Sequence, residues 1–141
     1  LGELEPVELD SFIKNCWRNV KTENATIVSD IDRTVRADRS RLKQLLENLF
    51  RNAVEHAGTD STVTVGAVDD GFFIADDGPG IAPEAQEEVF DVGYSTSDGG
   101  NGFGLSIGKR IARAHGWTVR VTEGMAGGAR FEIGGVDTLA E

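Results

Sequence analysis

The chain has 141 residues, of which 39% are hydrophobic, and this composition fits one globular domain with a core of its own. Its formal net charge of −10 argues against a nucleic-acid ligand and against an anionic membrane surface, since both require clustered Lys and Arg. No apolar run approaches the ~20 residues that span a bilayer, and a single Cys excludes an internal disulfide, so we expect a soluble domain in a reducing cytoplasm.

The first half of the chain predicts short strands alternating with two helices. Pro6 places the first strand at a sheet edge, and Asp10 or Ser11 is expected to cap the first helix. After a polar turn, Asp38 caps the most strongly patterned helix, and Gly58 ends it. The expected elements, in order, are a strand at 4–9, a helix at 10–20, a strand at 25–31 and a helix at 38–57.

The second half predicts two strand pairs with helices between them. Residues 69–71 form the turn of the first pair, Gly116 ends the last helix, and the tail after Gly134 is expected to fray. The expected elements are strands at 62–68 and 72–76, a short helix at 83–90, a mobile loop at 91–102, a helix at 104–115, and strands at 117–122 and 129–133.

These elements predict an α+β fold, a two-layer sandwich in one domain over residues 1–141. The sheet is mixed and mostly antiparallel, because adjacent strands form hairpins, and three main helices cover one of its faces. A ligand pocket would lie between the helices and their connecting loops. Cys16 falls on the apolar side of the first helix and is expected to be a buried, unreactive side chain.

Asn48, Asn52 and His56 form a row along the edge of the long helix's apolar stripe. An amide oxygen is a suitable Mg²⁺ ligand, so Asn52 could hold a metal ion while Asn48 orients a nearby group. The alternative is that both amides bond the backbone of a neighbouring loop, and this helix alone favours that alternative.

Two Gly-rich turns complete the candidate site. In residues 76–81 (DDGPGI), Asp76 at a strand end could accept a hydrogen bond from an exocyclic amine, although acidic surface turns are common. In residues 100–105 (GNGFGL), glycines open a helix whose N–H groups would attract phosphate. Neither a dinucleotide-binding βαβ unit nor a lysine-bearing phosphate loop is present.

Taken together, four motifs resemble the ATP-binding domain of sensor histidine kinases, which has the Bergerat-type fold. Residues 46–53 (LENLFRNA) resemble its N box and residues 76–81 its G1 box. Residues 88–96 contain EVF and GYST, which resemble the F box, and residues 100–105 resemble the G2 box. The order and spacing agree over essentially the whole chain.

The resemblance implies that Asn52 ligates Mg²⁺, that Asp76 reads the adenine amine, and that residues 91–103 form a lid over ATP. Asn48 and Asn52 would be the catalytic residues. The residues implied to contact the nucleotide are Asn48, Asn52, His56, Asp76, Gly78, Gly80, Ile81, Phe90, Gly100, Gly102, Phe103, Gly104 and Leu105.

The chain departs from the family pattern at two positions and in its expected lid, which is short of Lys and Arg. Glu55 stands where a Lys or Arg is usual, with His56 as a substitute phosphate contact, and Ala129 stands where a Thr borders the adenine pocket. A degenerate nucleotide-binding or scaffold module is therefore the alternative. The acidic composition fits either salt adaptation or a merely acidic protein.

Hydrolytic relatives carry a glutamate one turn before the metal asparagine, and Asn48 stands there, so phosphoryl transfer is expected rather than ATP hydrolysis. Glu47 points about 140° away from Asn52 on a helical wheel. Neither His56 nor His115 has the setting of a phosphoacceptor. The phosphoacceptor is expected on a separate domain, with a response regulator as an indirect partner and this domain as a monomer.

Overall fold

The computed structural model describes residues 2–20, 24–29, 31–57, 61–78, 104–123, 128–136 and 138–139. The helix expected at 83–90 and the loop expected at 91–102 lie outside these ranges. The elements are β1 (Glu5–Glu8), α1 (Leu9–Arg18), β2 (Thr26–Ser29), β3 (Thr34–Ala37), α2 (Arg39–Ala57), β4 (Thr62–Val68), β5 (Gly71–Asp76), α3 (Gly104–Ala114), β6 (Thr118–Glu123), β7 (Ala129–Gly134) and β8 (Thr138–Leu139).

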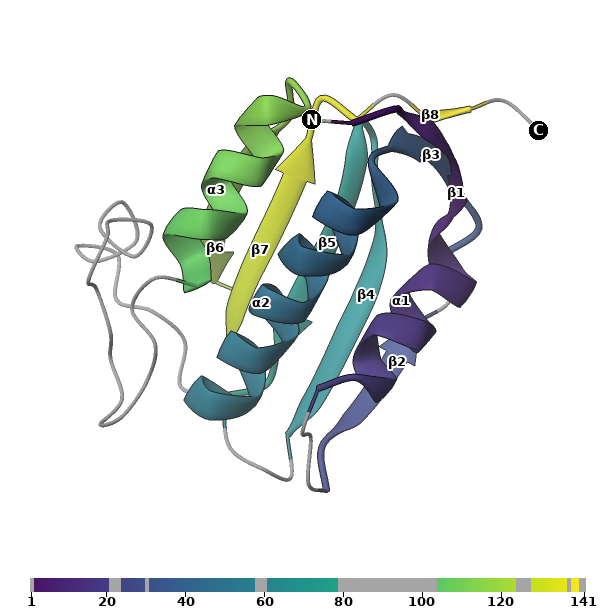
Figure 1. Ribbon diagram of the computed structural model, residues 1–141. Coiled ribbons are helices and arrows are strands. Elements are labelled where there is room, and N and C mark those ends of the chain that lie inside the picture. Colours follow the sequence, from purple (N-terminus) through teal and green to yellow (C-terminus); the bar gives the residue numbers. More distant parts are fainter. Residues whose placement is uncertain are drawn as a thin grey trace.

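The main sheet has five strands in the order β2-β4-β5-β7-β6. Only β2 and β4 run parallel, and the other neighbours are antiparallel. Helices α1, α2 and α3 cover one face of this sheet (Figure 1). The prediction of a two-layer α+β sandwich with a mixed, mostly antiparallel sheet is therefore confirmed.

The core lies between the sheet and α2. Alternate residues of the central strands point toward the helices, so Phe72, Ile74 and Phe131 are buried, together with Phe50 from α2. Burying an aromatic side chain of this size contributes about 1.5–3 kcal/mol. The ring of Trp17 meets Phe50 edge-on at 5.3 Å, which joins α1 to the same core.

A second sheet, in the order β1-β3-β8, was not predicted. Strand β3 follows the expected polar turn at once and pairs antiparallel with β1. The expectation of a frayed tail is wrong for residues 138–139, because β8 pairs with β3 and Val136 is buried. Strands this short depend on distant pairing partners, which local patterns do not reveal.

The helix caps show one confirmed prediction and one error. Asp38 caps α2, because its Oδ1 accepts the N–H of Arg41 at 3.2 Å. Helix α1 begins earlier than expected, at Leu9, so neither Asp10 nor Ser11 is its N-cap. Asp10 lies in the first turn instead, where its carboxylate interacts favourably with the helix dipole.

Two further expectations concern single residues. Cys16 is 2% exposed, as predicted for a buried apolar side chain. Gly116, at φ 82°, follows α3 in the left-handed conformation that glycine adopts most readily. Among the described residues, no helix combines the length and the apolar character that a membrane span requires.

Candidate nucleotide-binding site

Asp76 ends the central strand β5, at one end of the sheet, and is only 4% exposed. Its Oδ1 accepts two backbone N–H groups, from Gly78 at 2.9 Å and from Ala129 at 3.2 Å. A buried carboxylate needs such partners, and here they also fix its orientation. Asp76 is thus a buried carboxylate of fixed orientation, and its place at a strand end is as the sequence predicted.

The sequence reasoning missed the contribution of Gly128. A Cβ at this position would collide with the carbonyl oxygen and with Oδ1 of Asp76, so only glycine lets the start of β7 approach the end of β5 this closely. Ala129, which had been noted only for lacking a hydroxyl, contacts Asp76 through its backbone N–H. The signal in the sequence for this close approach was a pair of small residues directly before β7.

Asn48 and Asn52 lie one turn apart on α2, and both side chains are half-buried. Oδ1 of Asn48 accepts a hydrogen bond from the exposed side chain of Arg51 at 3.3 Å. Nδ2 of Asn48 is buried and has no hydrogen-bond partner among the residues that the structure describes. A buried amide donor without a partner is costly, and a ligand oxygen would satisfy it.

Asn48 and Asn52 are compatible with a magnesium ion whose ligands come mainly from a nucleotide. The part of the chain that the structure describes contains no group of three or more His, Cys, Asp or Glu side chains suited to a metal. Mg²⁺ commonly takes one or two protein oxygens and completes its shell with phosphates and water. The amide oxygen of Asn52 fits that role.

Glu47, the carboxylate adjacent to Asn48, is turned toward α1. Its Oε2 accepts a hydrogen bond from Asn19 at 3.4 Å and lies 4.0 Å from Nζ of Lys43. A general base must come within hydrogen-bonding reach of the attacking water. Glu47 faces away from Asn52, as the helical wheel predicted.

The elements that carry the predicted site meet at one end of the sandwich. Strand β5 ends and β7 begins where α2 ends and α3 begins (Figure 1). Gly104 starts α3, as predicted, and Leu105 follows it in the first turn. Helix α3 packs against α2 closely enough that a Cβ on Gly108 would lie 3.0 Å from Cδ1 of Leu45.

Several predicted residues are not among those that the structure describes. Gly80, Ile81, Phe90, Gly100, Gly102 and Phe103 lie outside the described ranges, and the side chains of Glu55, His56 and Leu105 do as well. The described part of the site therefore consists of Asn48, Asn52, Asp76, Gly78 and the start of α3.

Asp76 and Asp77 also border a hollow of about 340 Å³, which Phe73, Ala75 and Arg130 help to line. Phe73 and Ala75 alternate with the buried residues of β5, so this hollow opens on the sheet face opposite the helices. The asparagine row lies on the other side of the sheet. The hollow therefore shares Asp76 with the predicted site but lies across the sheet from the asparagine row.

Comparisons with known proteins bear on the fold and the family of this chain. The family model described as histidine kinase-, DNA gyrase B- and HSP90-like ATPase matches residues 37–137. The sensor histidine kinase ZraS of Salmonella typhi is 36% identical over 104 residues, which cover 70% of this chain and 22% of that protein. CpxA of Escherichia coli (strain K12) is 35% identical over 100 residues, which cover 65% of this chain and 22% of CpxA. The chain thus spans about a fifth of the length of these relatives.

Solved structures give the same picture. The mycobacterial sensor histidine kinase MprB matches with a TM-score of 0.79 at 26% identity, over 96% of this chain and 97% of the other. Full-length ShkA in complex with AMPPNP matches with a TM-score of 0.81 at 29% identity, over all of this chain (100%) and 33% of ShkA. Since the family model covers well over half of its residues, the chain belongs to the family of histidine kinase-, DNA gyrase B- and HSP90-like ATPases.

Proposed function

We propose that this domain binds ATP with Mg²⁺ and presents the γ-phosphate to a histidine on a separate phosphoacceptor domain, in two-component signal transduction. The observation that carries the proposal is the buried carboxylate of Asp76, fixed by the N–H groups of Gly78 and Ala129. A carboxylate held in this way accepts a hydrogen bond from the exocyclic amine of adenine without further ordering.

The phosphates would lie between α2 and the start of α3. Asn52 would offer its amide oxygen to Mg²⁺, and the bound ion would neutralise charge between the phosphates. The buried Nδ2 of Asn48, which has no partner in the described part of the chain, would donate to a ligand oxygen. Free N–H groups at the start of α3 would face the phosphates.

Phosphoryl transfer is better supported than ATP hydrolysis. Asn48 occupies the position of the hydrolytic glutamate and cannot accept a proton from water as a carboxylate can. Glu47 is engaged with Asn19, the C-cap residue of α1. Transfer to a histidine depends on positioning and charge neutralisation more than on a local base. The ATP hydrolase alternative is therefore disfavoured.

A degenerate scaffold module is the second alternative, suggested by Glu55 and Ala129. The contact between the N–H of Ala129 and Asp76 weakens this alternative, because the residue still supports the adenine-reading carboxylate without a hydroxyl. Binding of Mg²⁺ and ATP distinguishes the two proposals directly.

The role of the whole protein follows from its relatives. ZraS and CpxA are named sensor histidine kinases, and the chain matches about a fifth of their length. We infer that residues 1–141 form the ATP-binding domain of a larger sensor, in its cytoplasmic part. This domain would be monomeric in isolation, and a response regulator would receive the phosphoryl group afterwards.

Thermal unfolding with ATP, with and without Mg²⁺, tests nucleotide binding. Asp76→Asn keeps an oxygen for the two backbone N–H groups but loses the charge, so ATP affinity should fall about tenfold to a hundredfold. Asn52→Ala should mainly remove the dependence of binding on Mg²⁺. Asp77→Asn is the matched control, because Asp77 bonds the N–H of Thr62 and lies on the exposed side. Equal affinity in the Asp76 and Asp77 variants would contradict the assignment.

Transfer itself is tested with γ-labelled ATP and an added protein that carries the phosphoacceptor histidine. Label should appear on the added protein, and free phosphate should accumulate slowly in its absence. Rapid hydrolysis without a partner would overturn the proposal of transfer in favour of an ATPase.

A further inference from the structure

Arg51 is an exposed side chain in the second half of α2, directly before the predicted metal ligand Asn52. Its guanidinium group donates a hydrogen bond to Oδ1 of Asn48 at 3.3 Å. Within the described part of the chain it takes part in no ion pair, whereas Lys43 on the same helix lies 4.0 Å from Glu47. Asn48 is thus the acceptor that the described structure gives to this cation.

This hydrogen bond decides which end of the Asn48 amide faces the interior. A guanidinium group only donates hydrogen bonds, so the amide must turn its oxygen toward Arg51. The same rotation places Nδ2 on the other side of the planar amide, where it is buried and has no hydrogen-bond partner among the described residues. Asn48 therefore presents a donor, and not an acceptor, to its buried side.

Asn48 lies on the face of α2 against which α3 packs. Leu45, Asn48 and Asn52 follow one another at spacings of three and four residues, which places them along one face of the helix. On that face Leu45 lies against Gly108 of α3, and Gly104, one turn earlier, begins α3 where α2 approaches its end. The first N–H groups of a helix have no partner within it and attract anions. A phosphate at the start of α3 would therefore lie on the same side of α2 as the free donor of Asn48.

We propose that Arg51 is a positioning residue for the phosphates, because it holds the Asn48 amide with its oxygen outward and Nδ2 toward a phosphate oxygen. This role rests on the proposed function, since it needs a phosphate for Nδ2 to bind. The oxygen of Asn48 is then turned away from the site, and Asn52 supplies the amide oxygen for Mg²⁺. Without Arg51, water can bond either end of the Asn48 amide, and the reversed orientation sets an acceptor against the phosphates.

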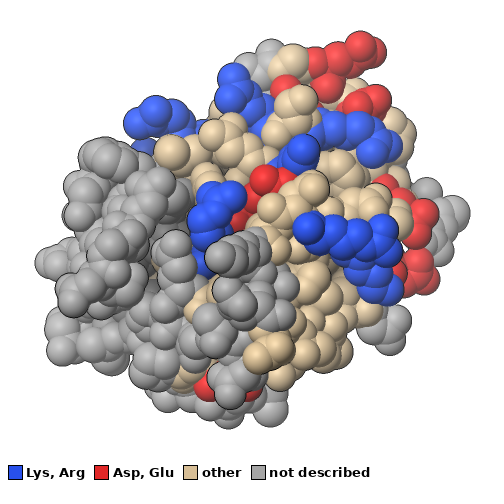
Figure 2. All heavy atoms as spheres, turned by 60° about the horizontal axis from the view of Figure 1, so that its bottom comes forward, with Lys and Arg blue, Asp and Glu red and all other residues tan. Residues whose placement is uncertain are grey.

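The alternative is that Arg51 attracts phosphate by its charge alone. In Figure 2, Lys and Arg side chains spread across the middle of the view, while most Asp and Glu side chains lie toward its margins. A positive field of this kind favours an anionic ligand without any role for the Asn48 amide. The two explanations must therefore be separated by experiment.

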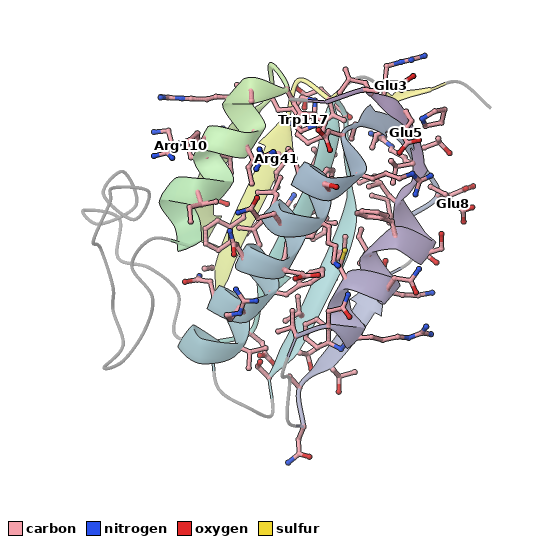
Figure 3. All side chains as sticks on the ribbon, in the orientation of Figure 1. Glu3, Glu5, Glu8, Arg41, Arg110 and Trp117 are labelled. Carbon is pink, nitrogen blue, oxygen red and sulfur yellow. The ribbon has the colours of Figure 1, made fainter. Side chains whose placement is uncertain are left out.

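Arg41 is the matched control for Arg51. It is exposed, lies on the same helix, and donates at 3.3 Å to the neutral amide of Gln44, three residues away. Figure 3 shows it near the start of α2, beside α3. Arg41 precedes Arg51 by ten residues, or about 15 Å along the helix axis, so it is removed from the predicted phosphate position.

The test measures the affinity of the domain for ATP with Mg²⁺, and for adenosine, by titration calorimetry. Arg51→Met leaves about half of the amides in the binding orientation, so ATP affinity should fall about twofold. Arg51→Glu offers an acceptor to Nδ2 and reverses the amide, so the loss should be about tenfold or more. Arg51→Lys keeps a donor and should retain nearly wild-type affinity. Adenosine has no phosphate, so its affinity should be unchanged in all three variants.

A double-mutant cycle with Asn48→Ala isolates the orientation of the amide from the effect of charge. When the amide is absent, Arg51→Glu should weaken ATP binding by less than about threefold at about 0.15 M salt, because screening leaves little of the remaining charge effect. Arg41→Met and Arg41→Glu should leave ATP affinity nearly unchanged. Circular dichroism should show that all variants are folded.

Several outcomes would overturn the proposal. These are equal losses in the Arg41 and Arg51 variants, an undiminished effect of Arg51→Glu in the Asn48→Ala background, or an equal loss of adenosine affinity. Tighter ATP binding by Arg51→Glu would also overturn it, because the oxygen of Asn48 would then be a ligand of the ion. If the wild-type domain binds ATP and one of these outcomes is found, the positioning role fails alone. If the wild-type domain does not bind ATP, the proposed function fails and the positioning role fails with it.

Discussion

The backbone N–H of Asp38 donates a hydrogen bond to Nε2 of His115 at 3.1 Å, and so ties the start of α2 to the end of α3. Because Nε2 accepts, the ring proton is on Nδ1, which lies 2.9 Å from the carbonyl oxygen of Ile111. His115 also stacks on Trp117 with centroids 4.2 Å apart. The sequence indicated only a helix-end residue here, whereas the structure shows a link between the two helices that carry the candidate site.

His115→Ala should destabilise the fold by about 1–3 kcal/mol, because two hydrogen bonds and a ring contact are lost and the N–H of Asp38 loses its acceptor. Chemical denaturation with urea gives this difference. Arg113→Ala, an exposed position on the same turn, should change stability by less than about 0.5 kcal/mol. Similar losses in the two variants would show that the link is not specific.

Asp38 should contribute a pH-dependent part of the stability. The N–H groups of Gly2 and Arg41 bond its carboxylate and lower its pKa from the ordinary value of 3.8. The charged form is thus favoured in the folded state, so the stabilisation is complete above about pH 4 and is lost as the pH falls through the folded pKa. Unfolding free energies measured at several pH values should show this loss, and Asp38→Asn should flatten it. An unchanged profile in Asp38→Asn would refute the assignment.

Gly128→Ala should impair both folding and nucleotide binding. The added methyl would collide with Asp76, and overpacking of this kind costs about 1–3 kcal/mol. Thermal unfolding with and without ATP reports both effects. Gly108→Ala is the control, since its methyl meets only the end of the Leu45 side chain and gains helix propensity. The assignment would be wrong if the two variants behaved alike.

Cys16 should resist alkylation in the folded protein. Burial and the negative charge of Glu47 raise the pKa of its thiol to about 12. At pH 8 the thiolate fraction is then about a thousandfold below that of an unfolded cysteine, and alkylation slows accordingly. Reaction with iodoacetamide, followed by mass spectrometry with and without denaturant, measures the ratio. Comparable rates in the two states would contradict the burial of Cys16.

The sequence revealed the elements whose determinants are local. The spacing of apolar residues predicted helix α2, and the turn residues predicted the β4–β5 hairpin, both nearly to the residue. Helix periodicity and hairpin turns depend on residues that are close in the sequence. Asp76 and the asparagine row were predicted from the same kind of local pattern, and their roles in binding stay predictions. Strands β3 and β8 and the approach of Gly128 to Asp76 were missed, because each joins residues far apart in the chain.

The contact of Asp76 with β7 has a consequence for the evolution of this site. One oxygen of the carboxylate proposed to read adenine also joins the end of β5 to the start of β7. A change of base preference at this position is therefore also a change in the sheet. Among single substitutions of Asp76, only residues that still present an oxygen acceptor there can alter specificity without loosening the strand pair. New nucleotide preferences are thus more accessible through the side chains around Asp76 than through Asp76 itself.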